Sequence, residues 1–264
     1  MTVHEIFTLL DGYAPTKLQM DFDNAGFLVG EAAQPVSKVL IALDITEEVV
    51  REAAETEAQL IVSHHPVIFH PLRSVTDQDP TGRTVRALVQ SGISAVCMHT
   101  NLDLVRNGVN DALARALSLA ETEILEPDGE DDWDEPYGLG RAGLWMEGPK
   151  PMSDFIYHVK TALNTPGVRC HDAGVPVHKV AVGGGACGSS MLAAKALGCD
   201  TFVTADLKYN DFLDARAIGI NLIDAGHFPT ENVICEPLAE FLAASCPNLT
   251  VEISSRHGDV VQYR

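Results

Sequence analysis

Residues 38–66 read KVLIALDITEEVVREAAETEAQLIVSHHP, a run that holds two apolar segments with a charged segment between them. The apolar segments Val39–Leu43 and Leu60–Val62 have the length and the β-branched content of buried strands. The intervening segment Thr46–Glu57 is predicted to be a helix. Alternation of strands and helices predicts an α/β fold.

The same alternation continues along the rest of the chain. Further strands are predicted at Ser94–Met98, Lys179–Val182, Thr201–Thr204 and Asn221–Ile223. Further helices are predicted within Met1–Asp11 and at Thr81–Gln90, Gly108–Leu117, Ser189–Leu197 and Asp211–Ile218.

The two halves of the chain resemble each other in this pattern. Each opens with a Lys-Val pair, and Lys38 to His65 spans 27 positions, as does Lys179 to Asp206. Each then continues through a helix to a Gly-Ile pair and a third strand. An internal duplication of one α/β unit is therefore predicted.

Composition narrows the classes of function. The 264 residues are 46% hydrophobic, which allows a substantial core. The formal charge of -19 makes the general field repel phosphate backbones and anionic membrane surfaces, so nucleic acid is not an expected partner. An anionic substrate would need a local cation, and a bound metal ion can supply one.

The sequence also predicts a soluble, cytoplasmic protein. No apolar run is long enough for a membrane span, and the first residues lack the pattern of a secretory signal. The six cysteines are scattered without a CxxC pair, and they are interpreted as buried, reduced thiols. The acidic stretch Glu121–Glu135, broken by Pro and Gly, is interpreted as a solvated connection between the two halves.

Two adjacent histidines follow a predicted strand. His64 and His65 come directly after Leu60–Val62, at the carboxyl end where open α/β sheets bind ligands. Pro66 keeps the pair extended, so the two rings are expected to point to opposite sides and to straddle two metal ions. Alone, the pair could also be a turn with two incidental histidines.

A second strand end carries His99 and Asp103, after Ser94–Met98. Asp103 could instead cap a turn or helix. His99 could ligate a metal, orient a ligand, or act as a catalytic proton shuttle, and the sequence leaves these alternatives open.

The third strand end carries His227 and Glu231, after Asn221–Ile223. If Pro229 lies in the first turn of a helix, the spacing of four places both side chains on one face. Without the other motifs, the Thr230-Glu231 pair would indicate only the start of a helix.

Three histidines and two carboxylates at three strand ends predict one dinuclear metal site. The predicted ligands are His64, His65, Asp103, His227 and Glu231. Imidazole with carboxylate suits Zn, Fe, Mn or Co better than Ca or Mg. Five ligands exceed the three usual for one catalytic zinc, so two divalent ions per chain are expected.

The glycine-rich loop Gly183–Gly188 lies between a predicted strand and a predicted helix and matches GxGxxG. It could bind a nucleotide, or an anion through its amides. The favoured interpretation is a tight turn that permits close packing, because a nucleotide loop leaves the five-ligand cluster unexplained.

These motifs resemble the Nif-three-like family of dinuclear-metal proteins, whose bacterial members are described as GTP cyclohydrolase I type 2 homologs. The resemblance rests on Asp23–Gly26 with Val29-Gly30, Ser63–Phe69, His99–Asp103, Tyr137–Arg141, and Asp224–His227 with Glu231. The loop Ala205–Asn210 and the tail Ser255–Asp259 depart from the family pattern, which leaves the loop's contribution open, a substrate contact among the alternatives.

The resemblance implies two intertwined α/β units with mixed sheets and the metal site in the cleft between them. The domains are expected at residues 1–125 with 227–264, and at 126–226. It also implies a toroidal homohexamer, a trimer of dimers, and the same five ligands.

Two functions from different classes follow. The first is a metal-dependent hydrolase that acts on a nucleotide-like substrate, with GTP as the implied example, through a metal-bridging hydroxide. Lys208 and Arg141 would then help to bind the phosphates. The second is a non-catalytic metal-binding or regulatory protein that interacts with other proteins.

Overall fold

The apolar segments form two separate mixed β-sheets in the computed structural model, which describes residues 1–130 and 134–264. The chain divides into two compact units, and each contains one of the sheets. Unit 1 comprises Met1–Leu102 with Cys235–Gly258, and unit 2 comprises Asp103–Ile234 with Asp259–Arg264. The predicted α/β class with mixed sheets is confirmed.

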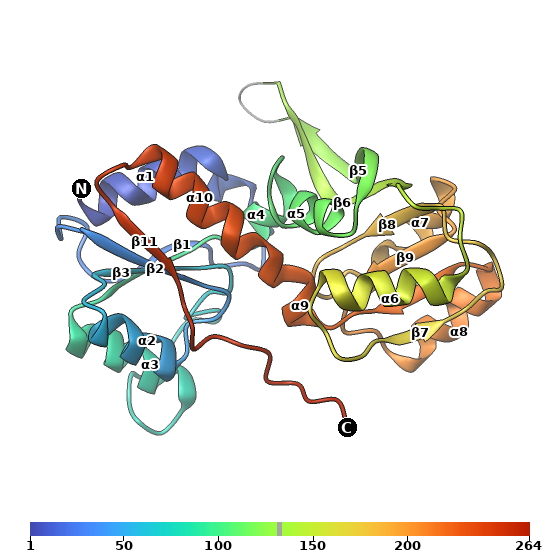
Figure 1. Cartoon of the computed structure of the whole chain (residues 1–264). Helices are drawn as coiled ribbons and strands as arrows, with labels where there is room; N and C mark the ends of the chain where they lie inside the picture. The colour runs from blue at the N-terminus through green and yellow to red at the C-terminus, as the bar shows by residue number, and fades with distance from the viewer. Residues whose placement is uncertain (131–133) are drawn as a thin grey trace. The chain divides into compact units, whose positions relative to one another are not determined.

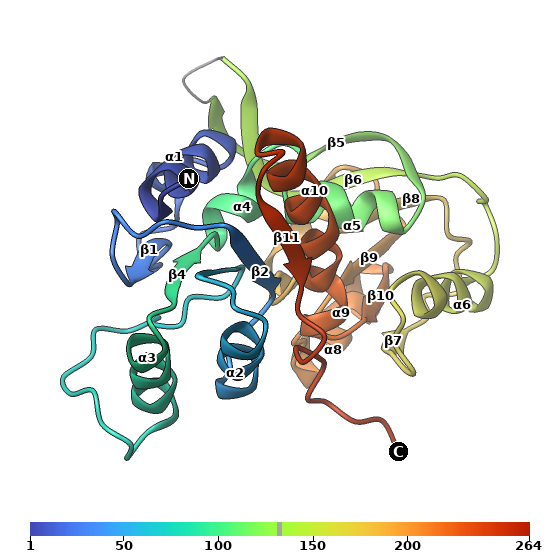
Figure 2. The ribbon, with the colours of Figure 1, turned by 60° about the vertical axis from the view of Figure 1, so that its left-hand side comes forward.

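Unit 1 is built on a five-stranded sheet in the order β1-β4-β3-β2-β11. Its strands are β1 (Gly26–Val29), β2 (Lys38–Ala42), β3 (Leu60–Ser63), β4 (Ser94–Cys97) and β11 (Thr250–Ile253). Neighbouring strands are parallel, except that β1 is antiparallel to β4. The helices α2 (Glu47–Glu55) and α3 (Pro80–Ser91) cover one face, and α1 (Val3–Tyr13) and α10 (Cys235–Ser245) cover the other (Figure 1 and Figure 2).

Side-chain alternation explains why this sheet is buried on both faces. Leu40, Ala42 and Ile61 belong to the core cluster formed with α2 and α3. Successive residues of a strand point to opposite faces, so the fully buried Val39 and Ile41 face α1 and α10. The continuous apolar run Val39–Leu43 is thus typical of a strand that is covered on both sides.

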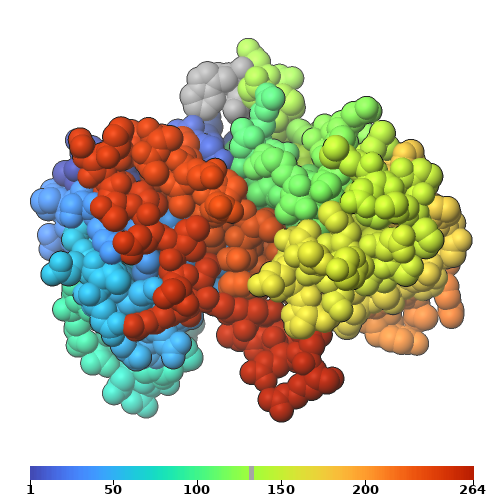
Figure 3. Space-filling view, in the orientation of Figure 1, coloured from blue at the N-terminus to red at the C-terminus, as the bar shows by residue number. Residues whose placement is uncertain are grey.

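The C-terminal part of unit 1 returns to its N-terminal part. Strand β11 pairs with β2, and the red atoms of α10 and β11 lie against the blue atoms of the first residues in Figure 3. Beyond β11, the buried carboxylate of Glu52 accepts hydrogen bonds from the Ser254 hydroxyl, from Ser255 N at 2.8 Å and from Ser255 Oγ at 2.6 Å. Burial raises the pKa of Glu52, but these hydrogen bonds outweigh it and hold the pKa below its ordinary value.

Unit 2 contains a six-stranded sheet in the order β5-β6-β8-β9-β10-β7. Its strands are β5 (Leu119–Glu130), β6 (Pro136–Trp145), β7 (Arg169–His171), β8 (Lys179–Val182), β9 (Thr201–Thr204) and β10 (Asn221–Asp224). The strands β8, β9 and β10 are parallel, and the other pairings are antiparallel. Four helices pack on its faces, α5 (Val109–Ala116), α6 (Met152–Ala162), α7 (Met191–Ala196) and α8 (Tyr209–Ile218).

Two core clusters cover the two faces of this sheet. Val180, Val182 and Val203 pack with α5 and α6. Ala181 and Phe202, one residue out of phase, pack with α7 and α8. This period of two explains why α5 and α6 lie on one face of the sheet and α7 and α8 on the other (Figure 1).

The predicted strands and helices are confirmed as elements, with ends that shift by a few residues. Both units contain three adjacent parallel strands linked by two helices, β2-α2-β3-α3-β4 in unit 1 and β8-α7-β9-α8-β10 in unit 2. This is the repeated pattern that the sequence offsets indicated.

The acidic stretch Glu121–Glu135 is not the connection between the two halves that its composition predicted. Most of it belongs to β5, which pairs with β6 in an antiparallel hairpin inside unit 2. Its charges are tolerated because most side chains of β5 are exposed. Residues 131–133 of this stretch lie outside the described residues.

The compact units divide the chain at different points from the predicted domains. The divisions follow Leu102, Ile234 and Gly258, and the first falls inside the short helix α4 (Thr100–Leu104). The domain boundaries drawn from the sequence stay a prediction.

Two expectations about the chain's environment can be compared with the structure. Five of the cysteines are buried, but Cys170 on the edge strand β7 is exposed, which corrects the interpretation of all six as buried. Within the described residues, every helix is too short or too polar to cross a membrane.

Replacing Glu52 by Gln should lower the free energy of unfolding by about 2 kcal/mol at neutral pH, because the amide cannot accept all of the hydrogen bonds of the carboxylate. The folded-state pKa lies below the ordinary value of 4.5. The stabilisation should therefore be complete above about that pH and should be lost as the pH falls through the folded-state pKa. Chemical denaturation across pH measures both effects.

Glu55 provides the matched control. It is an exposed carboxylate on the same helix that pairs with Arg256. Glu55→Gln should cost about 0.5 kcal/mol or less. Equal losses in the two variants would contradict a special role for Glu52.

Candidate metal centre

The end of β3 fixes the backbone of the two adjacent histidines. His64 N donates to Ala42 O at 3.3 Å and His65 N donates to Leu43 O at 2.9 Å, so the pairing with the β2 segment extends past the last residue of β3. Pro66 follows and prevents continuation as a helix. The two rings lie with centroids 5.0 Å apart. The expectation that the two rings straddle two metal ions stays a prediction.

Each imidazole in this part of unit 1 is held through its Nδ1 atom. The Nδ1 atom lies 2.8 Å from Met98 O in His64 and 2.7 Å from Asp44 Oδ1 in His65. A carbonyl or carboxylate oxygen only accepts, so Nδ1 carries the hydrogen and Nε2 keeps the electron pair. This is the tautomer that binds metals through Nε2.

His99 is held in the same way by Asp23. Its Nδ1 lies 2.6 Å from Asp23 Oδ1, while the second oxygen of Asp23 accepts from the Thr100 amide at 3.0 Å and from the Thr100 hydroxyl. Burial raises the pKa of Asp23, but the hydrogen bonds from His99 and Thr100 outweigh this effect and lower the pKa to about 2. Asp23 therefore stays ionised at neutral pH.

The three histidines converge. The His99 centroid lies 5.3 Å from that of His64 and 5.7 Å from that of His65. Each ring can place a ligand nitrogen within 4.8 Å of the others. Unit 1 thus presents a cluster of three nitrogen donors.

Unit 2 contributes a carboxylate pair. Asp103 in α4 and Glu231 in α9 (His227–Glu231) place carboxylate oxygens within 4.8 Å of each other. Glu231 is 4% exposed. Two carboxylates this close repel each other, and a cation between them would relieve the repulsion.

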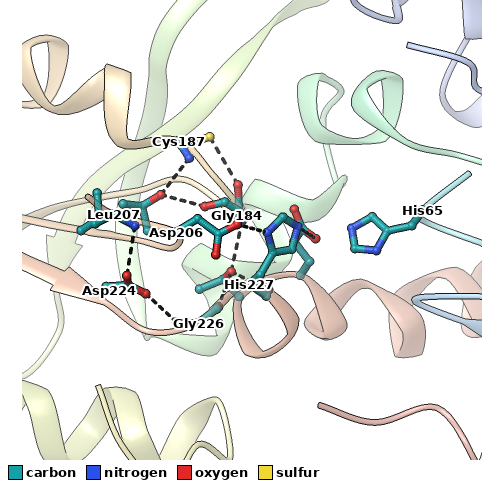
Figure 4. Close-up of polar contacts among 12 residues, drawn as sticks. His65, Gly184, Cys187, Asp206, Leu207, Asp224, Gly226 and His227 are labelled. Carbon is teal, nitrogen blue, oxygen red and sulfur yellow. Dashed lines mark hydrogen bonds and ion pairs between the residues drawn. The ribbon is translucent and has the colours of Figure 1, made fainter. Parts of the chain in front are cut away.

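His227 lies beside this pair. Its Nε2 is 2.9 Å from Glu231 Oε2. Its Nδ1 is 2.8 Å from Asp206 Oδ2, the contact drawn in Figure 4. Pro229 lies in the first turn of α9, as the sequence predicted, so the spacing of four brings His227 and Glu231 together.

Asp224 at the end of β10 fixes both loops that carry the His227–Asp206 contact. Its two carboxylate oxygens accept from Leu207 N and from Gly226 N, each at 3.1 Å (Figure 4). The chain on either side of the contact is thereby held in place. The loop Ala205–Asn210, whose contribution the sequence left open, supplies the carboxylate that orients His227.

The glycine-rich loop forms a wall behind Glu231. Gly184 N donates to Asn110 Oδ1 at 2.9 Å, and Gly185 N donates to Thr230 Oγ1 at 3.1 Å. Gly185 has φ +61°, and a Cβ there would lie 2.1 Å from Glu231 Oε1. Side chains of the protein already occupy these amides, which favours the tight-turn interpretation over an anion-binding loop.

Asn110 connects the two carboxylate segments of unit 2. It is fully buried, and while its Oδ1 accepts from Gly184 N, its Nδ2 donates to Asp103 O at 2.9 Å. One amide side chain therefore links the backbone of Asp103 to the loop that contacts Glu231.

Cys187 in the same loop is not a candidate ligand or nucleophile. Burial raises the pKa of its thiol far above the ordinary value, and the charges of Asp103 and Glu231 raise it further. The protonated thiol donates to Gly184 O at 3.3 Å.

The two predicted phosphate-binding residues lie in different surroundings. Arg141 is 4% exposed, and its guanidinium donates to Asp111 and to the carbonyl oxygens of Val105, Gly138 and Gly140. Lys208 is exposed and lines a pocket of about 700 Å³ together with Asp206, Asp211 and Asp214. The substrate contacts of both residues stay a prediction, and the geometry gives Arg141 a structural role.

Sequence reasoning did not assign the residues that orient the imidazoles. These acceptors lie far along the chain from the histidines that they hold. The separation is 76 positions for Asp23 and His99, and 21 positions both for Asp44 and His65 and for Asp206 and His227. No short sequence motif therefore predicts the pairs. The one sequence signal for these acceptors was the Asp23–Gly26 motif, which is part of the family resemblance but did not indicate that Asp23 orients a histidine.

Known proteins share this architecture. The Duf34/NIF3 (NGG1p interacting factor 3) family profile matches residues 1–259. The chain belongs to this family. Solved structures similar to this NIF3 protein include a hypothetical protein of Staphylococcus aureus, with a TM-score of 0.93 and 32% identity over 100% of this chain and 99% of that one. A Bacillus cereus protein related to NIF3 has a TM-score of 0.91 and 26% identity over 100% and 99% of the chains.

Curated relatives of this NIF3 protein carry the name GTP cyclohydrolase 1 type 2 homolog. The Streptomyces coelicolor protein is 36% identical over 260 residues, which cover 96% of this chain and 87% of that protein. The Clostridium perfringens protein is 33% identical over 234 residues, covering 88% and 87%.

The donor atoms fit divalent transition metals. Unit 1 offers oriented imidazoles, and unit 2 offers an oriented imidazole with two carboxylates, the mixture that suits Zn, Fe, Mn or Co. An oxygen-only shell of the kind that Ca²⁺ and Mg²⁺ prefer is absent from these two groups of described residues.

Replacing Gly185 by Ala should weaken metal binding at least about tenfold, because a Cβ would displace the Glu231 carboxylate. The variant should also lose about 1 kcal/mol of stability, since Ala is strained at positive φ. Competition with a chromophoric chelator measures affinity, and thermal denaturation measures stability.

Gly219→Ala is the matched control, because Gly219 has φ +69° and a Cβ there would have nothing within 4 Å. It should lose similar stability and keep full metal affinity. Equal metal affinities in the two variants would show that the loop does not set the position of Glu231.

Proposed function

We propose that this NIF3 protein is a metal-dependent hydrolase with a dinuclear centre. The proposed ligands are His64, His65, Asp103, His227 and Glu231. The observation that carries the proposal is the orientation of the imidazoles of His64 and His65, because an oxygen acceptor on Nδ1 of each of these two rings leaves Nε2 as the atom that can bind a metal. Family membership and the ligand motifs support the assembly of these residues into one centre.

Two ions would lower the pKa of a water molecule and polarise the group that it attacks. The protein's own residues prepare the ligands for this task. Asp44 and Asp206 hold the Nδ1 hydrogens of His65 and His227, which fixes the rings and raises their basicity. Asn110 and the glycine-rich loop restrain the two carboxylate segments.

The proposed substrate is nucleotide-like, with GTP as the example named in the relatives. Water would add at C8 of the guanine and open the imidazole ring, and a second hydrolysis would release formate. Because the chain carries a net charge of -19, the phosphates would depend on the metal ions and on local cations such as Lys208.

GTP hydrolysis tests the proposal with Glu231→Ala and the metal-loaded wild type. The wild type should bind about two transition-metal ions per chain and release formate, and the variant should retain clearly less metal and lose at least about 100-fold in rate. Metal analysis and a formate assay with GTP, GDP and guanosine measure these results.

Glu240→Ala, which changes an exposed carboxylate on α10, should behave as the wild type. Activity that survives in Glu231→Ala would exclude this centre as its source. A metal-loaded wild type that turns over none of the three compounds would argue against a guanine substrate.

A regulatory protein is the second candidate, favoured by the family description as an NGG1p interacting factor. In this function the ions would have a structural role and protein ligands would fill their coordination positions. Water exchange at the bound ions separates the two functions, because catalysis needs an open position and a closed site lacks one.

We also propose a homohexamer, a trimer of dimers. Tyr157, Leu192 and Tyr209 are 74%, 65% and 75% exposed in the isolated chain, and large apolar side chains at this exposure are typical of subunit contacts. Light scattering should give six times the chain mass of 28.4 kDa. A monomeric mass at micromolar concentration would contradict this prediction.

A further inference from the structure

The tail that follows β11 contacts the segment that holds His65. Beyond the last residue pair of β11 and β2, Ser254 N still donates to Ile41 O at 2.8 Å. Two residues further along β2, the Leu43 amide donates to Nδ1 of His257 at 3.0 Å, an imidazole instead of a backbone carbonyl. A side chain of the tail therefore continues the hydrogen bonding of the β2 segment where β11 has ended.

Leu43 and the residue after it hold His65 at two points. The His65 amide donates to Leu43 O at 2.9 Å, and Nδ1 of the His65 ring lies 2.7 Å from Asp44 Oδ1. Leu43 is fully buried, so its amide must find its partner within the protein, and His257 supplies that partner. The His257 ring thus contacts the short segment from which both hydrogen bonds to His65 come.

The tail residues before His257 are fixed by a buried carboxylate. Glu52 accepts hydrogen bonds from the Ser254 hydroxyl and from the amide and hydroxyl of Ser255. Ser254 Oγ in turn accepts from the amides of Arg256 and His257, each at 3.1 Å. Ser254 is 5% exposed. The imidazole is therefore presented by a turn that its own hydrogen bonds close, anchored to the buried Glu52.

The His257 ring is suited to accept this hydrogen bond. An imidazole nitrogen accepts only when it carries no hydrogen, so the Leu43 amide requires an electron pair on Nδ1. Burial lowers the pKa of His257 below its ordinary value of 6.5, although the charges of Asp44 and Glu52 act in the opposite direction. The ring is therefore neutral at neutral pH, as its acceptor role requires.

We propose that His257 is a positioning residue for the metal centre and acts through the segment formed by Leu43 and Asp44. With the acceptor in place, this segment keeps the carboxylate at the Nδ1 side of the His65 ring, so that the ring presents Nε2 to the metal. The inference rests on the proposed metal centre and is independent of hydrolysis. It gives the tail Ser255–Asp259 a function in the orientation of a ligand.

Two substitutions of similar size separate the acceptor from the packing of the ring. His257→Leu removes the acceptor and should weaken Co²⁺ binding by about fivefold, somewhat below the roughly 10- to 100-fold cost of losing a direct orienting partner. His257→Asn places its Oδ1 near the former Nδ1 and should bind Co²⁺ as the wild type does. His4→Ala, which changes an exposed histidine on α1, should also keep the wild-type affinity. Competition with a chromophoric chelator measures the affinities.

A double-mutant cycle with Asp44→Ala tests the route from the tail to the ligand. Asp44→Ala removes the direct partner of the His65 ring, so His257→Leu should have little further effect on Co²⁺ affinity in that background. An equal loss of affinity in both backgrounds would show that His257 does not act through Asp44, and it would overturn the proposal.

Proton NMR of the metal-free protein gives a second readout that needs no metal. The Nδ1 hydrogen of His65 should give an exchangeable signal that is absent from His65→Ala. In His257→Leu this hydrogen should exchange with water at least about tenfold faster, because Asp44 is no longer held beside it, and His257→Asn should restore slow exchange. A tail that only stabilised the fold would lower the melting temperature of His257→Leu without changing this exchange well below the transition.

The outcomes separate this proposal from the proposed function. Wild-type cobalt affinity and wild-type His65 exchange in His257→Leu, with the fold retained by circular dichroism, would overturn the positioning role and leave the hydrolase standing. A wild type that binds no cobalt would contradict the metal centre, and the NMR comparison would then decide whether His257 holds the His65 ring. Absence of GTP turnover would bear only on the hydrolase.

Discussion

The hydrogen bond on Nδ1 of each imidazole is the constraint on which the candidate centre depends. Without it, a histidine at a strand end could rotate and could present either nitrogen. Met98 O, Asp44 and Asp23 remove that freedom in unit 1, and Asp206 does so in unit 2. The acceptor oxygens lie near the carboxyl ends of neighbouring strands, or in a loop beside those ends. The order of the strands in each sheet therefore determines which oxygen contacts which imidazole.

The carboxylates of unit 2 need restraint of another kind. Asp103 and Glu231 repel each other, and each would turn toward solvent if its backbone were free to move. Asn110 ties the Asp103 carbonyl to the glycine-rich loop, and Gly185 leaves just enough space for Glu231. Asn110 and Gly185 therefore allow the carboxylates of Asp103 and Glu231 to lie close together. This arrangement suits a metal site, although the repulsion between the two charges lowers the stability of the fold.

The sequence predicted the elements that depend on local periodicity and missed those that depend on tertiary partners. Residues 38–66 form a strand, a helix and a strand. The two strands were predicted correctly because both faces of their sheet are covered, so their sequences are continuous apolar runs. Strand β5 was missed because its exposed side chains are largely acidic and two irregularities in its pairing break the alternation. Ligand candidates were found because strand ends are visible in a sequence, whereas Asp44 behind His65 is visible only in the fold.

The two donor groups are chemically unequal. The cluster in unit 1 is neutral, with imidazole nitrogens throughout, and the cluster in unit 2 carries two negative charges with one imidazole. Neutral nitrogen donors compensate little of an ion's charge, so an ion held by them remains a strong Lewis acid and acidifies its water. Carboxylates neutralise their ion and hold it by charge. A metal centre that uses both kinds of donor would therefore be held by the charge of the carboxylates, while the imidazoles would leave the metal able to acidify water.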